Sequence, residues 1–143
     1  MTVVAFYTSV PDRLLYVCRL LRKVQQSGAQ IGVCGPTALL DRLDSALWRF
    51  EPVEFVPHLR FKTGALPSGS LGASPVLLTE DPADLPHRAL LLNLGQTMPD
   101  GFEPFERVFE VVSADAEQAE IGRQRFRQYK DLGHDMVHYK VPV

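Results

Sequence analysis

Short apolar runs alternate along the chain with longer segments that have helical spacing. The first run, VVAFY at 3–7, is rich in β-branched and aromatic residues, which is typical of a strand. Pro11 and Asp12 follow and suit the first turn of a helix, where a carboxylate faces the positive helix end. The apolar side of this helix consists of Leu14, Leu15, Cys18, Leu21 and Val24. Gly28 then predicts the helix end.

The second unit repeats this order of strand and helix. The stretch QIGVCG at 30–35 predicts a short strand, and Pro36 and Thr37 open a second helix. One stripe of that helix is apolar, and its members are Leu39, Leu40, Leu43, Ala46 and Leu47.

The rest of the chain predicts further strands and one more helix. Apolar runs at 75–79 and 88–94 lack alternation, as expected for strands covered on both faces, and 107–112 predicts another strand. A helix at 116–132 ends at Gly133, and a short last strand follows at 135–141. Strands that alternate with helices predict the α/β class: a three-layer sandwich with a mainly parallel sheet. We expect one domain over residues 1–143, with a loop without assigned role at 63–75.

Composition narrows the class of protein. The 143 residues are 45% hydrophobic and 22% charged, which fits one domain with a core. The formal net charge of −2 argues against a broad nucleic-acid surface. Cys18 and Cys34 have no CxxC spacing and are expected to be reduced structural thiols. Without a basic leader or an apolar run of about 18 residues, we expect an unprocessed cytosolic protein.

The predicted fold also suggests nucleotide binding, but the phosphate-binding signature is missing. The first strand-to-helix turn reads TSVPD and has no glycine, and neither GxGxxG nor GxxxxGK[ST] occurs. The fold is therefore Rossmann-like without a phosphate loop. A small nucleotide-binding or nucleotide-hydrolysing protein stays the alternative, and a direct single-strand binder is a weaker third.

No residue pattern demands catalysis, a cofactor or a metal. His134 and His138 have HxxxH spacing, but Gly133 ends the helix before them. On a strand, the two imidazoles would share a face about 13 Å apart, at roughly 3.3 Å per residue, which is too far for one ion. We expect a surface strand and no enzyme activity.

The last helix gathers basic residues around an aromatic ring. At about 100° per residue, Arg123, Phe126, Arg127 and Lys130 share one arc. An ordinary solvated face that complements the helix dipole is one interpretation. The phenylalanine among the cations favours another, a site for a carboxylate beside an apolar side chain. We expect the opposite side of the helix to form the core boundary, and it contains Ile121, Arg125, Tyr129 and Leu132.

The stretch LDSALWRFEPVEFVPH at 43–58 begins with helical spacing and ends irregularly. Trp48 and Phe55 could fold back over the second helix as a hydrophobic lid. Alternatively they form an exposed anchor for a partner, in one patch with Val56 and Pro57, as is typical of interface hot spots.

Several segments together resemble a known family. LDSALWRFEPVEFVPH, the LLLNL strand, FERVFEVV and RQRFRQYKDLGHDM occur in the order seen in the chi-subunit family of bacterial DNA polymerase III holoenzyme. The resemblance implies a non-enzymatic accessory subunit of the clamp-loader assembly, with a single α/β domain. It also implies two partners, the psi subunit of the clamp loader and the acidic C-terminal tail of single-stranded-DNA-binding protein, with little direct nucleic-acid binding.

The resemblance further implies a role for particular residues. The psi-binding surface would consist of Trp48, Phe55, Val56, Pro57 and His58. The tail-binding pocket would consist of Val112, Arg123, Phe126 and Arg127. Relatives can carry a further lysine one turn before the pocket arginine. This chain has Ala119 and Glu120 there, which predicts weaker attraction for an acidic tail.

Overall fold

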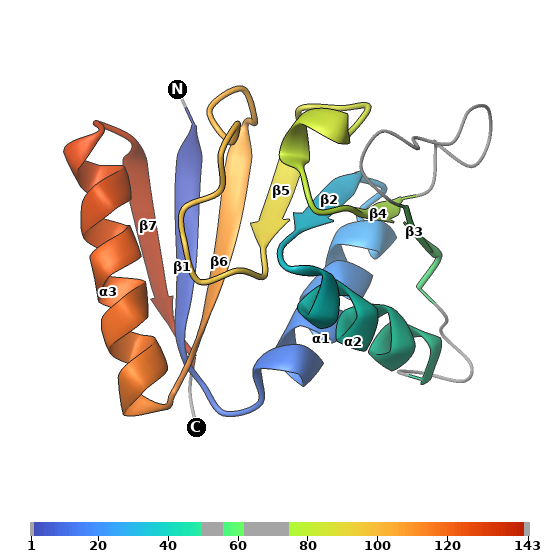
Figure 1. The fold of residues 1–143 in the computed structure, drawn as a ribbon, viewed down its shortest axis with the longest axis horizontal. Coiled ribbons are helices and arrows are strands. Elements are labelled where there is room, and N and C mark those ends of the chain that lie inside the picture. Colours follow the sequence, from blue (N-terminus) through green and yellow to red (C-terminus); the bar gives the residue numbers. More distant parts are fainter. Residues whose placement is uncertain (1, 50–55, 62–74, 142–143) are drawn as a thin grey trace.

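The described part of the chain forms one sheet of seven strands, in which every strand pair is parallel (Figure 1). The computed structural model describes residues 2–49, 56–61 and 75–141. The strands are β1 Val3–Val10, β2 Ile31–Cys34, β3 His58–Arg60, β4 Val76–Leu78, β5 Leu90–Asn93, β6 Arg107–Ser113 and β7 Asp135–Lys140. Their order in the sheet is β3-β4-β2-β5-β6-β1-β7, so β3 and β7 are the two edge strands.

Three α-helices connect the described strands. They are α1 Arg13–Gln26, α2 Thr37–Arg49 and α3 Ala116–Asp131, and a short 3-10 helix, η2, spans Pro82–Asp84. Asp12 and Asp115 cap the starts of α1 and α3, because their carboxylates accept hydrogen bonds from backbone N–H groups of the first turn. Gly28 and Gly133 follow the helix ends with φ of 83° and 88°, a conformation that glycine adopts without strain.

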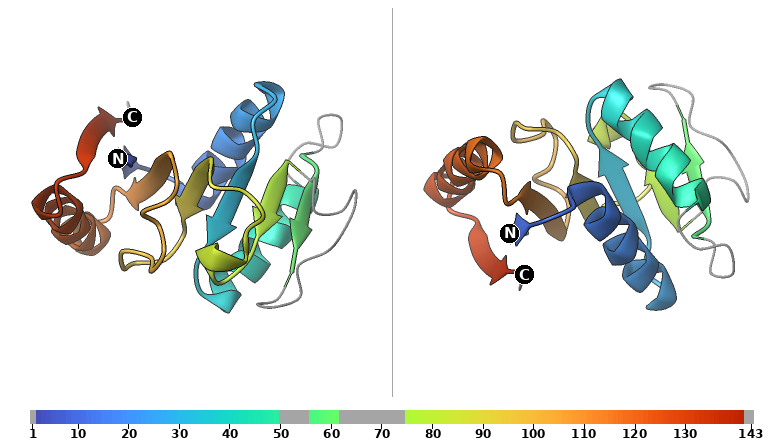
Figure 2. Two further views of the ribbon diagram at one scale, coloured as in Figure 1. Left: turned by 90° about the horizontal axis from the view of Figure 1, so that it is seen from above. Right: turned by 90° about the horizontal axis from the view of Figure 1, so that it is seen from below.

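Two hydrophobic cores lie on opposite faces of the sheet, because successive residues of a strand point to opposite sides. Ala5 packs in the core that includes the apolar stripes of α1 and α2. Its neighbours Val4 and Phe6 pack in the other core, which includes Tyr129 of α3. Figure 2 shows α3 beside the β7 end of the sheet and α2 beside the β3 end. The chain is thus an α/β sandwich with a Rossmann-like open sheet.

Most of the predicted elements are confirmed to within a few residues, and the differences have physical reasons. The predicted loop at 63–75 lies outside the described residues except for its last position. The edge strand β3 was not predicted, because three residues are too few for a periodic pattern. Leu132 was placed at the core boundary, but it is 58% exposed because α3 ends at Asp131. None of the described helices is both long and apolar enough to span a membrane.

A buried polar cluster fixes α3 to the sheet. Glu110 of β6 is fully buried, and its Oε1 accepts a hydrogen bond from Arg125 Nε at 3.1 Å. Its Oε2 accepts from Tyr129 OH at 2.7 Å and from Asn93 Nδ2 at 2.9 Å. Burial raises the pKa of Glu110, and the Arg125 guanidinium opposes that rise. Because Arg125 points into the core at Glu110, Arg123 and Arg127 lie on a different side of α3.

Candidate functional site

A pocket of about 500 Å³ lies between α3 and the sheet, near the carboxyl ends of β1 and β6. These neighbouring strands lead into helices on opposite faces, β1 into α1 and β6 into α3. Such a switch in direction opens a crevice in parallel sheets. The pocket is lined by Phe6, Thr8, Ser9, Val112, Ser113, Ala114, Ala119, Gly122, Arg123, Phe126, Arg127, His138 and Lys140. All four residues of the predicted tail pocket are among them.

Apolar side chains form the inner part of this α3 pocket. Phe126 is partly buried and meets Phe6 of β1 edge to face, with ring centroids 5.2 Å apart. Val112, at the end of β6, belongs to the same core and is 4% exposed. The pocket can therefore accept an apolar side chain against an aromatic and aliphatic wall.

Gly122 sets the distance between α3 and β6. A Cβ atom at this position would lie 2.8 Å from Val112 Cγ1 and 2.9 Å from Cγ2. Sequence reasoning did not identify Gly122, although a glycine inside a helix disfavours the helix by about 1 kcal/mol and so often signals close packing.

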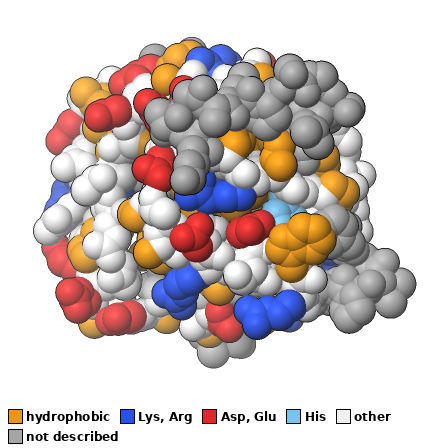
Figure 3. All heavy atoms as spheres, turned by 45° about the vertical axis from the view of Figure 1, so that its right-hand side comes forward, with side chains coloured by type: hydrophobic (Ala, Val, Ile, Leu, Met, Phe, Trp, Pro, Cys, Tyr) orange, Lys and Arg blue, Asp and Glu red, His pale blue; other side chains and the backbone are white. Residues whose placement is uncertain are grey.

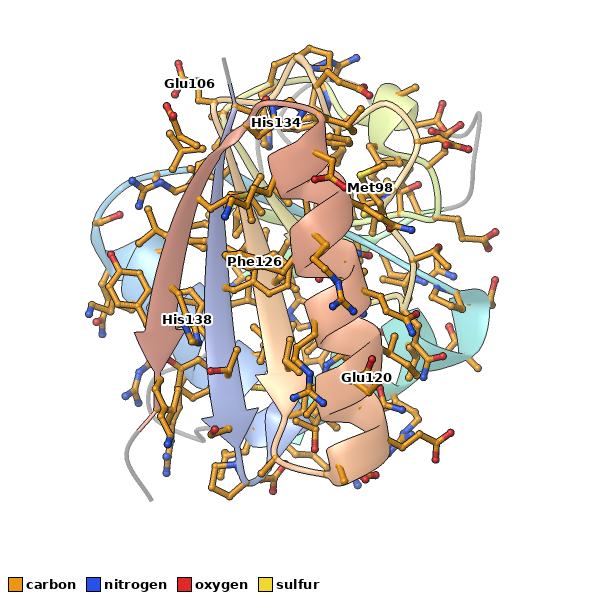
Figure 4. The ribbon with its side chains drawn as sticks, turned by 90° about the vertical axis from the view of Figure 1, so that its left-hand side faces the viewer. Met98, Glu106, Glu120, Phe126, His134 and His138 are labelled. Atoms are coloured by element: carbon orange, nitrogen blue, oxygen red, sulfur yellow. The ribbon has the colours of Figure 1, made fainter. Side chains whose placement is uncertain are left out.

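Two guanidinium groups border the pocket on α3. Arg123 and Arg127 are 63% and 64% exposed, and Glu120 forms an ion pair with each of them. Arg123 Nη2 donates to Glu120 Oε2 at 2.6 Å, and Arg127 Nη2 lies 3.7 Å from Oε1. The hydrogen bond from Arg123 holds the pKa of Glu120 below its usual value. Figure 4 shows Glu120 near the start of α3 and Phe126 pointing across toward β7.

The opposite wall of the pocket comes from β7, which sequence reasoning missed. His138 and Lys140 line it, with His138 Nε2 2.6 Å from Thr8 Oγ1. The ring of His138 faces Phe126 with centroids 6.4 Å apart (Figure 4). The alternation of DMVHYK could have indicated this face, because residues two apart in a strand share a side. Lys130, which shared the predicted basic arc, does not line the pocket.

The surface around Trp48 lies at the other edge of the sheet. Trp48, in the last turn of α2, is 64% exposed, which confirms the predicted exposure. Its ring meets His58 edge to face at 5.2 Å. His58 is fixed in turn, since Nε2 lies 2.8 Å from Asp44 Oδ1 and Nδ1 lies 2.8 Å from the carbonyl oxygen of Val56. The His58 side chain, which was predicted as part of the partner-binding surface, is only 1% exposed and therefore supports Trp48 without forming the surface itself. Figure 3 shows hydrophobic surface on this face, with charged groups around it.

The composition of the predicted aromatic patch needs one correction. Val56 is fully buried and packs in the core of α1 and α2, so the expectation that it forms part of an exposed patch was wrong. The chain enters β3 at this point, which turns the Val56 side chain inward. Pro57 is partly exposed, whereas Phe55 lies outside the described residues. Asp44 was missed, although its i, i+4 spacing from Trp48 places both on one helix face.

The crevice between β2 and β5 bears on the nucleotide alternative. This hollow of about 440 Å³ is lined by acidic residues Glu80, Asp81 and Asp100, which disfavour a phosphate group. Burial raises the pKa of the Cys34 thiol at its base, so a thiolate nucleophile is disfavoured there. Among the described residues, no three His, Cys, Asp or Glu side chains are grouped to hold a metal ion.

Comparison with known proteins places the chain among similar sequences. Residues 1–137 match the family described as DNA polymerase III chi subunit, HolC. DNA polymerase III subunit chi of Pseudomonas aeruginosa is 34% identical over 149 residues, covering 99% of each chain. The subunit of the same name from Haemophilus influenzae is 28% identical over 123 residues, covering 83% of this chain and 81% of the relative.

Proposed function

The chain belongs to the DNA polymerase III chi-subunit family and has an accessory role in replication, and we propose that it is a non-catalytic adaptor. One surface binds the psi subunit of the clamp loader or an equivalent partner. The other binds the acidic C-terminal tail of single-stranded-DNA-binding protein. The protein thereby links the clamp loader to the protein that coats single-stranded DNA.

The observation that carries the proposal is the separation of the two surfaces. The α3 pocket includes the edge strand β7, and the exposed ring of Trp48 contacts His58 of the opposite edge strand β3. Six strand spacings of about 4.8 Å separate these edges, or roughly 29 Å. Two partners can therefore bind at once without steric conflict, as an adaptor requires.

The α3 pocket has the chemistry that a peptide carboxyl terminus needs. Arg123 and Arg127 offer donors to the terminal carboxylate, and a final aromatic side chain packs against Phe126 and Val112. Each charge-assisted hydrogen bond contributes about 1.5 to 3 kcal/mol, and burial of the aromatic ring contributes about 2 kcal/mol. The loss of entropy when the disordered tail becomes ordered costs several kcal/mol of this gain. We expect a net binding free energy of about −7 to −8 kcal/mol, a micromolar dissociation constant.

At the Trp48 surface, the contribution to partner binding is hydrophobic. An exposed indole held by a fixed imidazole is a rigid anchor that loses little side-chain entropy on binding. The Val56 side chain contributes through the core that supports β3 and not through contact with the partner.

The decisive experiment compares two forms of one acidic peptide that ends in phenylalanine. Calorimetric titration of the full chain with the free-acid peptide should give a micromolar dissociation constant. The amidated peptide lacks the terminal charge and should bind at least about tenfold more weakly, the effect of about 1.4 kcal/mol. Equal affinities for the two forms would contradict a pocket that recognises a carboxyl terminus.

The adaptor role requires that both sites be occupied together. Saturating the chain with the free-acid peptide should leave its affinity for purified psi subunit unchanged within about twofold, since the sites do not overlap. For the nucleotide alternative, a ligand at a hundred times its dissociation constant would add about 2.7 kcal/mol of stability, which thermal unfolding would detect.

A further inference from the structure

We propose that β7 supplies a second cationic wall in the α3 pocket, where Lys140 contacts the acidic side chains that precede the terminal residue of a bound peptide. The inference rests on the proposed tail binding and adds an orientation to it. The terminal carboxylate lies at Arg123 and Arg127 on α3, and the peptide then crosses the end of β1 toward β7.

The strand geometry places Lys140 in the pocket. Lys140 pairs with Thr8 of β1, and the alternation of side chains puts it on the same face as His138. The residue between them, Tyr139, lies on the other face and stacks on Tyr7, with centroids 5.1 Å apart and ring planes at 19°. This stacking fixes the rotation of β7, so that Lys140 faces α3.

The charges of the two walls differ in their pairing. On α3, Glu120 lies within 2.6 Å of Arg123 and 3.7 Å of Arg127. Lys140 is exposed and forms no ion pair with another residue in the described part of the chain. A peptide carboxylate that reaches Lys140 therefore displaces no ion-pair partner from among the described residues.

The space between the walls fits a peptide better than a phosphate chain. Between the cations lie the apolar groups Phe6, Val112 and Phe126, and His138 continues this surface to β7. A polymer of regularly spaced phosphates would bring charge over the rings of Phe6 and Phe126, which have no donor to meet it. An acidic peptide with an apolar terminal side chain fits better. Its carboxylates can meet the cations at both walls, and its apolar side chain can pack in the centre.

The test is a cycle between one protein charge and the peptide charges. Fluorescence anisotropy would measure the full chain and its Lys140→Gln variant against two free-acid peptides that end in phenylalanine, one with three upstream aspartates and one with asparagines. Lys130→Gln is the matched control, because Lys130 has the same charge on α3 but does not line the pocket. Lys140→Gln should lower the affinity for the aspartate peptide about threefold to fivefold, and the affinity for the asparagine peptide by less than about 1.5-fold.

Each result decides the inference. The proposal of a second cationic wall would be wrong if Lys140→Gln lowered the affinity for both peptides equally or for neither. It would also be wrong if Lys130→Gln caused the same loss of affinity. Tail binding itself would survive each of these results. A wild-type chain that binds neither peptide would instead remove the proposed tail site, and the inference with it. Thermal unfolding of Lys140→Gln should match the wild type, since this side chain is exposed at the strand end.

Discussion

Glu120 Oε2 accepts hydrogen bonds from both Nε and Nη2 of Arg123, at 3.0 Å and 2.6 Å. The same carboxylate lies 3.7 Å from Arg127 Nη2 through its other oxygen. A peptide carboxylate that meets either arginine must therefore compete with a carboxylate from the same helix. This competition gives a physical basis to the weaker attraction that the Ala119 and Glu120 pair predicted.

Replacing Glu120 with glutamine should strengthen binding of the free-acid peptide by about threefold, which is within the range for an exposed ion pair. Glu117→Gln, in the first turn of α3, makes the same charge change outside the pocket and serves as the control. Because the pKa of Glu120 is lowered, its carboxylate stays ionised to a lower pH than usual. Its competition with the peptide fades only as pH falls through the lowered value. The gain should thus be equal at pH 6 and pH 8. A calorimetric titration that finds no gain over Glu117→Gln would show that Glu120 does not compete.

Removing the Arg123 guanidinium should weaken peptide binding at least about tenfold, because one lost contact of about 1.4 kcal/mol already does so. The wild-type affinity should also fall with added salt, because salt shortens the distance over which exposed charges attract each other, which is about 8 Å at physiological ionic strength. Circular dichroism should show an unchanged fold, because the side chain is 63% exposed. If Arg123→Ala bound the peptide normally, the basic face would be an ordinary solvated helix surface.

Trp48→Ala should abolish partner capture with little loss of stability. Truncating a hot spot removes about 2 to 4 kcal/mol of binding, whereas a side chain that is 64% exposed contributes little to the core. Since Trp48 is the only tryptophan, its fluorescence reports the surface directly. An aqueous quencher should reach it in the free chain, and bound psi subunit should shield it. Full shielding in the free chain would remove the basis for docking there.

Val56→Ala is the matched contrast at the same segment. It should lower the free energy of unfolding by about 2 kcal/mol, because two methyl groups leave the core and a cavity remains. Partner affinity should be retained in the fraction that is folded. Chemical denaturation and binding measured on the same variant would separate the two effects.

The sequence predicted one wall of the pocket and missed the other, for a reason that lies in the residues. Helical spacing identified Arg123, Phe126 and Arg127, because one element carries all three and its period is known. His138 and Lys140 are far from α3 in the sequence, and only the pairing of β7 with β1 brings them to the same pocket. Periodicity describes one element at a time and cannot give strand order.

The same limit explains Arg125. Spacing placed it away from the basic arc, which is confirmed, but the partner that permits its burial is Glu110 on β6. No local pattern connects these two positions. Val56 was misjudged for the reverse reason: the prediction followed its position beside Phe55 and Pro57 in the sequence, while its own side chain packs in the core that includes residues of α1 and α2.

Arg125→Met should destabilise the protein by about 3 to 5 kcal/mol, because it leaves the buried Glu110 carboxylate without its charge partner. The pKa of Glu110 is already raised by burial. An acid with a raised folded-state pKa contributes stability that is present below its unfolded pKa and is lost as pH rises through the folded value. Without Arg125 this loss should grow, so the variant should lose more stability between pH 5 and pH 8 than the wild type. Parallel pH profiles of denaturant midpoints would contradict this account.

Gly122→Ala should narrow the α3 pocket and weaken binding of the free-acid peptide, because the new Cβ would lie 2.8 Å from Val112 Cγ1. A gain in helix propensity of about 1 kcal/mol opposes an overpacking loss of about 1 to 3, so stability should change little or fall slightly. The matched rescue is the double variant Gly122→Ala with Val112→Ala, which removes the two Cγ atoms that the new methyl group would meet. Peptide affinity in the double variant should exceed that of Gly122→Ala by more than Val112→Ala alone changes the wild type. Additive effects in this cycle would mean that Gly122 does not act through its contact with Val112.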